Sequence, residues 1–116
     1  MKRYAVRPRI RITDDEEVIA IGPGKADLLG AIAGSGSIRA AASELGMSYM
    51  RAWNLVKTMN AAFRSPLVEK VRGGSHQGGA RLTDRGRAVL DLYRQMETKA
   101  ATAIRGEWRR MRRQLA

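Results

Sequence analysis

The sequence predicts a small, mainly helical domain that also contains two short β-hairpins. Apolar residues recur at helical spacing between residues 25 and 63 and again from residue 83 onward. Two pairs of short apolar, partly β-branched runs enclose a polar turn and a glycine-rich turn. The chain has 116 residues, a length typical of one domain with one core.

Composition excludes several classes of protein. The chain has no cysteine and only His76, so a disulfide framework, a cysteine-ligated metal and a Ser–His enzyme are all disfavoured. No apolar run approaches the ~18 residues of a membrane span, and the N-terminus has no apolar signal core. We therefore expect a cytoplasmic protein that is not an enzyme and that has no cofactor or metal.

The N-terminal residues 1–22 are expected to form a β-hairpin that packs on the domain. One strand covers residues 6–13, and Val18–Ile21 forms the other before Gly22-Pro23-Gly24 ends it. The acidic residues 14–17 lie between the two strands. Four consecutive side chains cannot all converge on one ion, so we interpret them as a solvated turn and not as a metal site.

Residues 25–63 are expected to form three helices. The first covers residues 25–33 and is stopped by residues 34–36. Ser37 can cap a second helix that ends at Leu45, where Gly46 suits a left-handed backbone. Ser48 can cap a third helix over residues 49–63, and Pro66 prevents its continuation.

The second and third of these helices have the features of a helix-turn-helix. Ala41 and Ala42 offer small side chains where the helices cross, and Gly46 makes the turn. An ordinary helical hairpin shares these features and remains an alternative. The expected inward positions are Leu45, Met47, Ala52, Leu55, Val56 and Met59.

The outward face of the third helix is the candidate DNA-reading surface. Its side chains can hydrogen-bond base edges and phosphates or touch thymine methyl groups. Trp53 and Tyr49 could instead pack at the boundary of the core. The candidates are Ser48, Tyr49, Met50, Arg51, Trp53, Asn54 and Lys57, with Ser37 and Arg39 on the DNA backbone.

A strand, a glycine-rich tip and a return strand follow the third helix. Strands over residues 67–71 and 80–82 would form the wing of a winged helix, completing a DNA-binding domain over residues 23–82. A phosphate-binding nucleotide loop is disfavoured because no GK[ST] sequence is present. The candidate wing contacts are Arg72, Gly73, Gly74, Ser75, His76, Gln77 and Arg81.

Residues 83–116 are expected to form one long helix capped by Thr83, with a break near Gly106 left open. An apolar stripe continues beyond any assignable core, which favours a two-fold dimer over a solvated tail. The arginines near its end either flank DNA or keep the helix solvated. The candidate dimer residues are Tyr93, Met96, Ala100, Ile104, Trp108 and Met111.

The charge balance indicates a polyanionic partner. Twenty-two Lys and Arg residues oppose eleven Asp and Glu residues, giving a net charge of +11. Residues 59–116 hold 13 of the basic residues and only 5 of the acidic ones. Nucleic acid is favoured over an anionic membrane surface or a charged surface that serves only solubility.

The stretches GSIRAAASELGMSYMRAWNLVKTMN and LVEKVRGGSHQGGARLTDRGRAVLDLY resemble the N-terminal DNA-binding domain of ModE-type molybdate-responsive regulators. That domain is similar to the winged helix of LysR-type regulators. The resemblance covers residues 26–96 and implies a homodimeric transcription factor. It also implies that the helix over residues 49–63 enters the major groove and that the wing at residues 73–79 reaches adjacent DNA.

The resemblance does not extend to oxyanion sensing. Family members continue into domains that bind molybdate or tungstate, and we expect this chain, which stops at Ala116, to lack them. Sensing of molybdate or another oxyanion effector is therefore not carried over. The leading hypothesis is a sequence-specific, homodimeric regulator that binds double-stranded DNA. A nucleoid-type protein with little sequence preference and a protein-interaction adaptor are the alternatives.

Overall fold

The structure is a computed structural model that describes residues 2–72 and 78–116. Within these residues it has five helices and two antiparallel hairpins, which confirms the mainly helical fold class. In chain order the elements are β1 (Ile12–Thr13), β2 (Ile19–Ile21), α1 (Pro23–Ser35), α2 (Ile38–Glu44), α3 (Tyr49–Ala62), β3 (Val68–Val71), β4 (Gly79–Leu82), α4 (Asp84–Ala103) and α5 (Arg105–Arg112).

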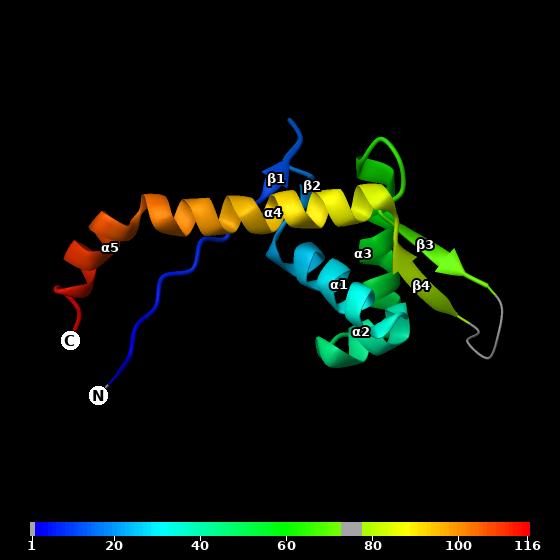
Figure 1. The fold of residues 1–116 in the computed structure, drawn as a ribbon, viewed down its shortest axis with the longest axis horizontal. Coiled ribbons are helices and arrows are strands. Elements are labelled where there is room, and N and C mark those ends of the chain that lie inside the picture. Colours follow the sequence, from blue (N-terminus) through cyan, green and yellow to red (C-terminus); the bar gives the residue numbers. More distant parts are fainter. Residues whose placement is uncertain (1, 73–77) are drawn as a thin grey trace.

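The molecule is elongated because α4 extends beyond the helices that it covers. Its principal extents are 55 × 36 × 23 Å. Figure 1 shows α1, α2 and α3 gathered under the first half of α4, while β3 and β4 project at one end. The second half of α4, α5 and the N-terminal segment lie toward the other end, where both chain termini are found.

The N-terminal hairpin is shorter than predicted. Its turn is as expected, because the Oδ1 atom of Asp14 accepts hydrogen bonds from the amides of Glu16 (2.8 Å) and Val18 (2.9 Å). Ile12 pairs with Ile21, but β1 contains only two residues instead of a strand over residues 6–13. Since β2 has three residues before α1 begins, residues 6–11 have no partner strand within the hairpin.

The predicted helix boundaries of the central region are confirmed to within about two residues. Gly36 (φ 78°) ends α1 in the left-handed conformation, and its amide donates to the carbonyl of Ile32. The Oγ atom of Ser37 accepts from the amide of Ala40, and that of Ser48 accepts from the amide of Arg51, so both serines are N-caps. Gly46 (φ 69°) makes the turn between α2 and α3.

The core forms where α1, α2, α3 and the first half of α4 meet. Ala41 and Ala42 are buried at the helix crossing, as predicted. Leu45 was expected to face inward, but 36% of it is exposed because it is the C-cap of α2 and lies in the turn. The largest fully buried side chains are Ile21, Leu28, Leu29, Ile32, Met59, Leu67 and Tyr93.

The last predicted helix is two helices. The Oγ1 atom of Thr83 accepts from the amide of Gly86 (3.0 Å), which confirms the expected N-cap of α4. The helix breaks at Ile104 (φ −96°, ψ 7°), two residues before Gly106. Gly106 itself lies inside α5, so the break does not use the glycine.

Candidate nucleic-acid interface

One face of α3 is exposed while the opposite face is buried. Ala52, Val56 and Met59 point into the core, as predicted from their spacing. The outward candidates Ser48, Tyr49, Met50, Arg51, Asn54 and Lys57 are all exposed, and Met50 is 63% exposed. The helix therefore presents two arginine or lysine side chains, an amide and a thioether on its outer surface.

Trp53 lies at the boundary between the two faces. Its ring is half-buried and packs against the core cluster, while the Nζ atom of Lys57 lies 4.9 Å from the ring centroid. A cation over a tryptophan face is held by the ring quadrupole. The structure therefore gives Trp53 a packing role and makes it a support for Lys57.

Tyr49 and Arg39 form a second pair that joins α2 to the first residue of α3. The guanidinium carbon of Arg39 lies 4.5 Å from the centroid of the Tyr49 ring. Both residues are exposed, and Arg39 was expected on the DNA backbone. The contact with the ring holds the arginine side chain between the first turn of α2 and the first residue of α3.

Ser37, which was expected to contact the DNA backbone, also has a structural role. Its hydroxyl oxygen caps α2, and its backbone carbonyl accepts a hydrogen bond from the hydroxyl of Ser35 (3.1 Å). An isolated β-bridge pairs it with Gly79, and the amide of Ala80 donates to the carbonyl of Gly36. This segment consequently fixes the amino end of α2 against the returning strand β4.

The second hairpin is the predicted wing. Val68 pairs with Leu82 and Val71 pairs with Gly79 in an antiparallel register. Arg72 follows β3 and is exposed, in agreement with its expected position beside the tip. The predicted tip contacts Gly73, Gly74, Ser75, His76 and Gln77 lie outside the described residues.

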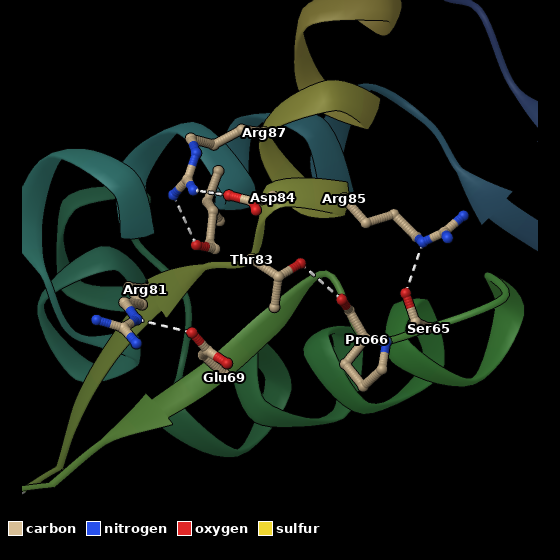
Figure 2. Close-up of a pocket in the computed structure, with 9 residues that line it drawn as sticks. Ser65, Pro66, Glu69, Arg81, Thr83, Asp84, Arg85 and Arg87 are labelled. Atoms are coloured by element: carbon tan, nitrogen blue, oxygen red, sulfur yellow. Dashed lines mark hydrogen bonds and ion pairs between the residues drawn. The ribbon is translucent and has the colours of Figure 1, made fainter.

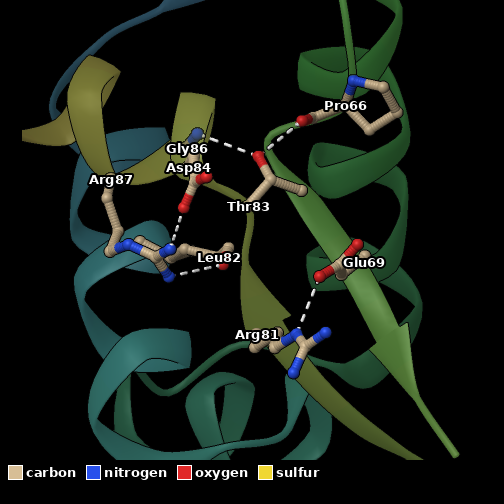
Figure 3. A network of polar contacts seen from close by, with 8 residues as sticks. All are labelled: Pro66, Glu69, Arg81, Leu82, Thr83, Asp84, Gly86 and Arg87. Carbon is tan, nitrogen blue, oxygen red and sulfur yellow. Dashed lines mark hydrogen bonds and ion pairs between the residues drawn. The ribbon is translucent and has the colours of Figure 1, made fainter.

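Arg81 is already paired within the wing. Its Nε atom lies 2.7 Å from the Oε1 atom of Glu69 on the neighbouring strand (Figure 3). Sequence reasoning did not single out Glu69, although strand register places it directly opposite Arg81. A DNA contact by Arg81 would have to compete with this carboxylate, so its side chain is a weaker candidate than Arg72.

Asn60 connects α3 to the wing and was missed by the sequence analysis. Its Oδ1 atom accepts from the amides of Leu67 (2.8 Å) and Val68 (3.1 Å), and its Nδ2 atom donates to the carbonyl of Val68 (3.1 Å). One side chain therefore positions the first residues of β3 relative to α3. An asparagine near the end of a helix that precedes a strand was the available signal.

A shallow pocket of about 670 Å³ lies at the base of the wing, beside the start of α4. Figure 2 shows three arginines around it, each directed toward an oxygen of the protein. Arg85 donates to the hydroxyl of Ser65 (2.5 Å), Arg87 pairs with Asp84, and Arg81 pairs with Glu69. The first contact joins α4 to the segment before β3, the second lies within α4 and the third within the wing. Two carboxylates therefore oppose the three arginines, so the pocket is not proposed as an anion site.

Comparison with known proteins identifies the architecture. Residues 26–87 match the family described as the bacterial regulatory helix-turn-helix protein, lysR family. The match begins in α1, contains α2, α3 and the wing, and ends in the first turn of α4.

The chain belongs to this family.

A solved structure of the same LysR-type architecture is a complex with DNA. It is titled "Crystal structure of CbnR_DBD-DNA complex" and superposes with a TM-score of 0.56 at 26% identity, covering 76% of this chain and 93% of that one. CbnR, described as a LysR family transcriptional regulator, matches at a TM-score of 0.54 and 27% identity over 72% of this chain and 28% of that chain. The winged helix-turn-helix fold is thereby confirmed.

Curated relatives confirm the resemblance to ModE-type regulators. The molybdenum transport protein ModE of Azotobacter vinelandii is 39% identical over 101 residues, which are 86% of this chain and 37% of that protein. The DNA-binding transcriptional dual regulator ModE of Escherichia coli K12 is 42% identical over 71 residues, 61% of this chain and 27% of that protein. The LysR-family chain thus spans about a third of the length of these relatives.

The second half of α4 and α5 carry the apolar residues expected at a dimer interface. Met96, Ile104 and Met111 are exposed, and Ala100 and Trp108 are half-buried. Leu92 was not among the predicted residues, yet it is 59% exposed on α4. Since Met96 lies one helical turn after Leu92, the two side chains extend the apolar surface toward the domain.

Tyr93 has a different role from the other predicted dimer residues. It is only 1% exposed, and its hydroxyl donates to the backbone carbonyl of Ile10 (2.6 Å). Burial, together with the nearby Glu97 carboxylate, raises the pKa of Tyr93 and keeps the hydroxyl protonated as a donor. The side chain attaches the N-terminal segment to α4 within one chain and leaves no surface for a partner.

In the ranges 2–72 and 78–116, no three His, Asp or Glu side chains are grouped so that they could hold a metal ion. The helices of these ranges are also too short or too polar to cross a bilayer. The acidic turn at Asp14 uses its first carboxylate to accept backbone amides, as described above.

Proposed function

We propose that this chain is the DNA-binding unit of a transcriptional regulator that binds double-stranded DNA as a homodimer. The observation that carries the proposal is the two-faced α3, which buries Ala52, Val56 and Met59 and exposes Arg51, Asn54 and Lys57 beside a wing. A DNA complex among the similar structures supports the same use of this architecture. Such a regulator would act in the cytoplasm, where bacterial DNA lies.

The side chains divide into two groups by their expected contacts. Asn54 and Arg51 can hydrogen-bond base edges from α3, because amide and guanidinium groups match the donor and acceptor patterns of the major groove. Arg39, Lys57 and Arg72 would contact phosphates, which supply affinity without sequence information. The net charge of +11 favours the approach of this surface to any duplex.

The homodimer would use the exposed apolar residues of α4 and α5. Leu92 joins the predicted set, and Tyr93 is left out because it is buried in its own chain. The proposed interface residues are therefore Leu92, Met96, Ala100, Ile104, Trp108 and Met111. Two-fold pairing would place two α3 helices on one face of a duplex, about one helical turn (~34 Å) apart.

A binding selection from a random duplex library tests the proposal. We expect enrichment of a two-fold symmetric sequence, and an affinity for it at least about 10³-fold above that for random DNA. A ratio near one would instead identify a nucleoid-type protein that coats DNA. Failure to bind any duplex at low salt would reject DNA binding and favour an adaptor that binds protein.

A further inference from the structure

A groove of about 880 Å³ lies between the N-terminal hairpin, the start of α1 and one flank of α3. Its lining is mostly apolar and includes Val18 and Ile19 of the hairpin together with Leu55 and Ala62 of α3. Val18 is 59% exposed and Ile19 is 37% exposed. The groove therefore leaves in solvent two β-branched side chains that a bound apolar group would cover.

The rim of the groove carries an excess of positive charge. Arg9, Arg11, Lys25 and Arg51 line it, against the two carboxylates of Asp14 and Glu17. Asp14 uses a carboxylate oxygen to accept two backbone amides of its own turn. Among residues 2–72 and 78–116, no ion pair involves the three arginines, so their charges are available to a ligand.

Lys25 lies partly below the surface in the same groove. Its Nζ atom donates to the backbone carbonyl of Ile19 (2.5 Å), which holds the ammonium group against the hairpin. Burial lowers the pKa of Lys25 because it disfavours the charged form. An anion bound beside the ammonium group would offset this cost.

The size and chemistry of the groove select one class of ligand. Its volume lies within the ~300–1,000 Å³ range of small-molecule sites, which are mostly apolar with a few polar groups that orient the ligand. A DNA backbone is polar along its whole length and would leave the apolar lining uncovered. We propose that this groove binds a small organic anion whose apolar body lies between β2 and α3 and whose acidic group pairs with the rim cations.

Occupancy of the groove would be coupled to DNA binding. Arg51 lines the groove, and it also belongs to the α3 surface proposed to contact DNA. A ligand that pairs with Arg51 removes that side chain from the duplex, so ligand and DNA should weaken each other's binding by the same factor. This coupling rests on the proposed function, whereas the ligand site itself does not.

Titration of the whole chain with anilinonaphthalene sulfonate, an apolar aromatic anion whose fluorescence rises in apolar sites, tests the site. We expect saturable binding of one probe per chain. Thr58→Trp fills the groove and should weaken the probe at least about tenfold, a change that corresponds to 1.4 kcal/mol. Thr98→Trp is the matched control, because both threonines are exposed and donate to a carbonyl of their own helix.

A charge variant keeps the test decisive if Thr58→Trp unfolds the protein. Arg9→Gln with Arg11→Gln changes two exposed side chains, and it should weaken the sulfonate probe about threefold or more. Phenylnaphthylamine, the uncharged relative of the sulfonate probe, should bind the variant and the parent chain equally. The proposed site would be overturned if the folded Thr58→Trp variant or the double arginine variant bound the sulfonate probe like the parent chain. It would also be overturned if Thr98→Trp weakened the probe as much as Thr58→Trp.

The coupling has a separate readout. Saturating sulfonate probe should weaken binding to the selected duplex severalfold, and the neutral probe should have less effect. A probe that binds in the groove and leaves DNA affinity unchanged would reject the coupling while the site stands. Absence of duplex binding by the parent chain would reject the proposed function alone, because the fluorescence titration contains no DNA.

Discussion

Single side chains of α3 can be separated into those that hold the fold and those that are available to DNA. Asn54 and Asn60 lie on the same helix, six residues apart, with the same amide group. Asn54 is exposed, whereas Asn60 makes three hydrogen bonds to the start of β3. The same residue type is therefore structural at position 60 and a proposed DNA contact at position 54, and only the fold distinguishes the two positions.

Asn54→Ala tests the base-reading role. Loss of an amide that contacts a base edge costs about 1–3 kcal/mol at the cognate site, and random DNA should be bound almost as before. Fluorescence anisotropy with both duplexes measures the two affinities. Lys57→Ala is the control, since loss of a phosphate contact should weaken binding to both sequences alike. A uniform loss in Asn54→Ala would remove Asn54 from the base-reading set.

Gly86 is a residue whose lack of a side chain is required by packing. A Cβ atom there would lie 2.0 Å from the carbonyl oxygen of Leu67, where backbone leaves no room to adjust. We expect Gly86→Ala to lower the free energy of unfolding by about 2 kcal/mol or more, measured by urea denaturation. Gly34→Ala is the control, because nothing lies within 4 Å of its position inside α1. It should be neutral or stabilising by up to about 1 kcal/mol.

At the scale of elements, the wing depends on α3 for its position. Three hydrogen bonds from Asn60 fix β3, and the wing is also linked to α4 through Thr83, whose hydroxyl donates to the carbonyl of Pro66 (2.7 Å; Figure 3). The wing and α3 would contact one duplex together, so a change in their relative position should affect DNA affinity. We therefore expect DNA affinity to depend on the contacts between α3 and the wing as well as on each element.

Asn60→Ala should loosen the wing. It leaves two amides and one carbonyl without their partner in a half-buried place, which costs about 1–3 kcal/mol of stability. Urea denaturation measures this loss, and DNA affinity should fall for cognate and random duplexes together. Gln95→Ala removes an exposed amide from α4 and should change neither quantity. A stability equal to that of the parent chain would show that the wing is held by other contacts.

Most elements were predictable because their signals are local. Ser37, Ser48 and Thr83 cap helices through amides three residues away, and Gly46 is the residue that a left-handed turn requires. The outward face of α3 follows from helical periodicity in the same way. These features need no knowledge of distant parts of the chain.

The features that sequence reasoning missed depend on distant residues. Gly86 is needed for the close approach of Leu67, a requirement that no residue beside it in the sequence indicates. Tyr93 was assigned to the dimer interface, whereas its hydroxyl donates a hydrogen bond to the backbone carbonyl of Ile10, 83 residues away. A break near Gly106 was left open, and the structure has it at Ile104, two residues earlier, a position that no local signal in the sequence marked. The wing tip was predicted in detail but lies outside the described residues.

At the scale of the whole molecule, apolar residues on α4 and α5 remain exposed in the single chain. A double change Met96→Asp and Ile104→Asp should lower the dimer fraction, because it would bury charges in the proposed interface. Sedimentation equilibrium measures the mass. Thr98→Asp with Thr102→Asp adds the same charge to exposed positions of α4 and should leave the mass unchanged. If the Met96→Asp and Ile104→Asp variant kept the same mass as the control variant, the interface would lie elsewhere.

The net charge of +11 makes the affinity for DNA depend on salt. If the dimer neutralises ~6–10 phosphates, affinity should fall about 10³–10⁵-fold between ~50 and ~200 mM salt. A titration series in this range measures the slope of log affinity against log salt concentration. Arg72→Gln should make the slope shallower by about one unit for each phosphate contact that it removes. A slope near zero would show that phosphate contacts contribute little.

The shared position of the chain termini has a practical consequence. Both ends lie at the same end of the elongated molecule, away from the hairpin of β3 and β4 (Figure 1). A fluorophore joined to either end would therefore stay clear of the wing, and a donor and acceptor on the two ends of one chain would both lie at that end of the molecule. Energy transfer between them would report detachment of the N-terminal segment from α4 without placing a label near DNA.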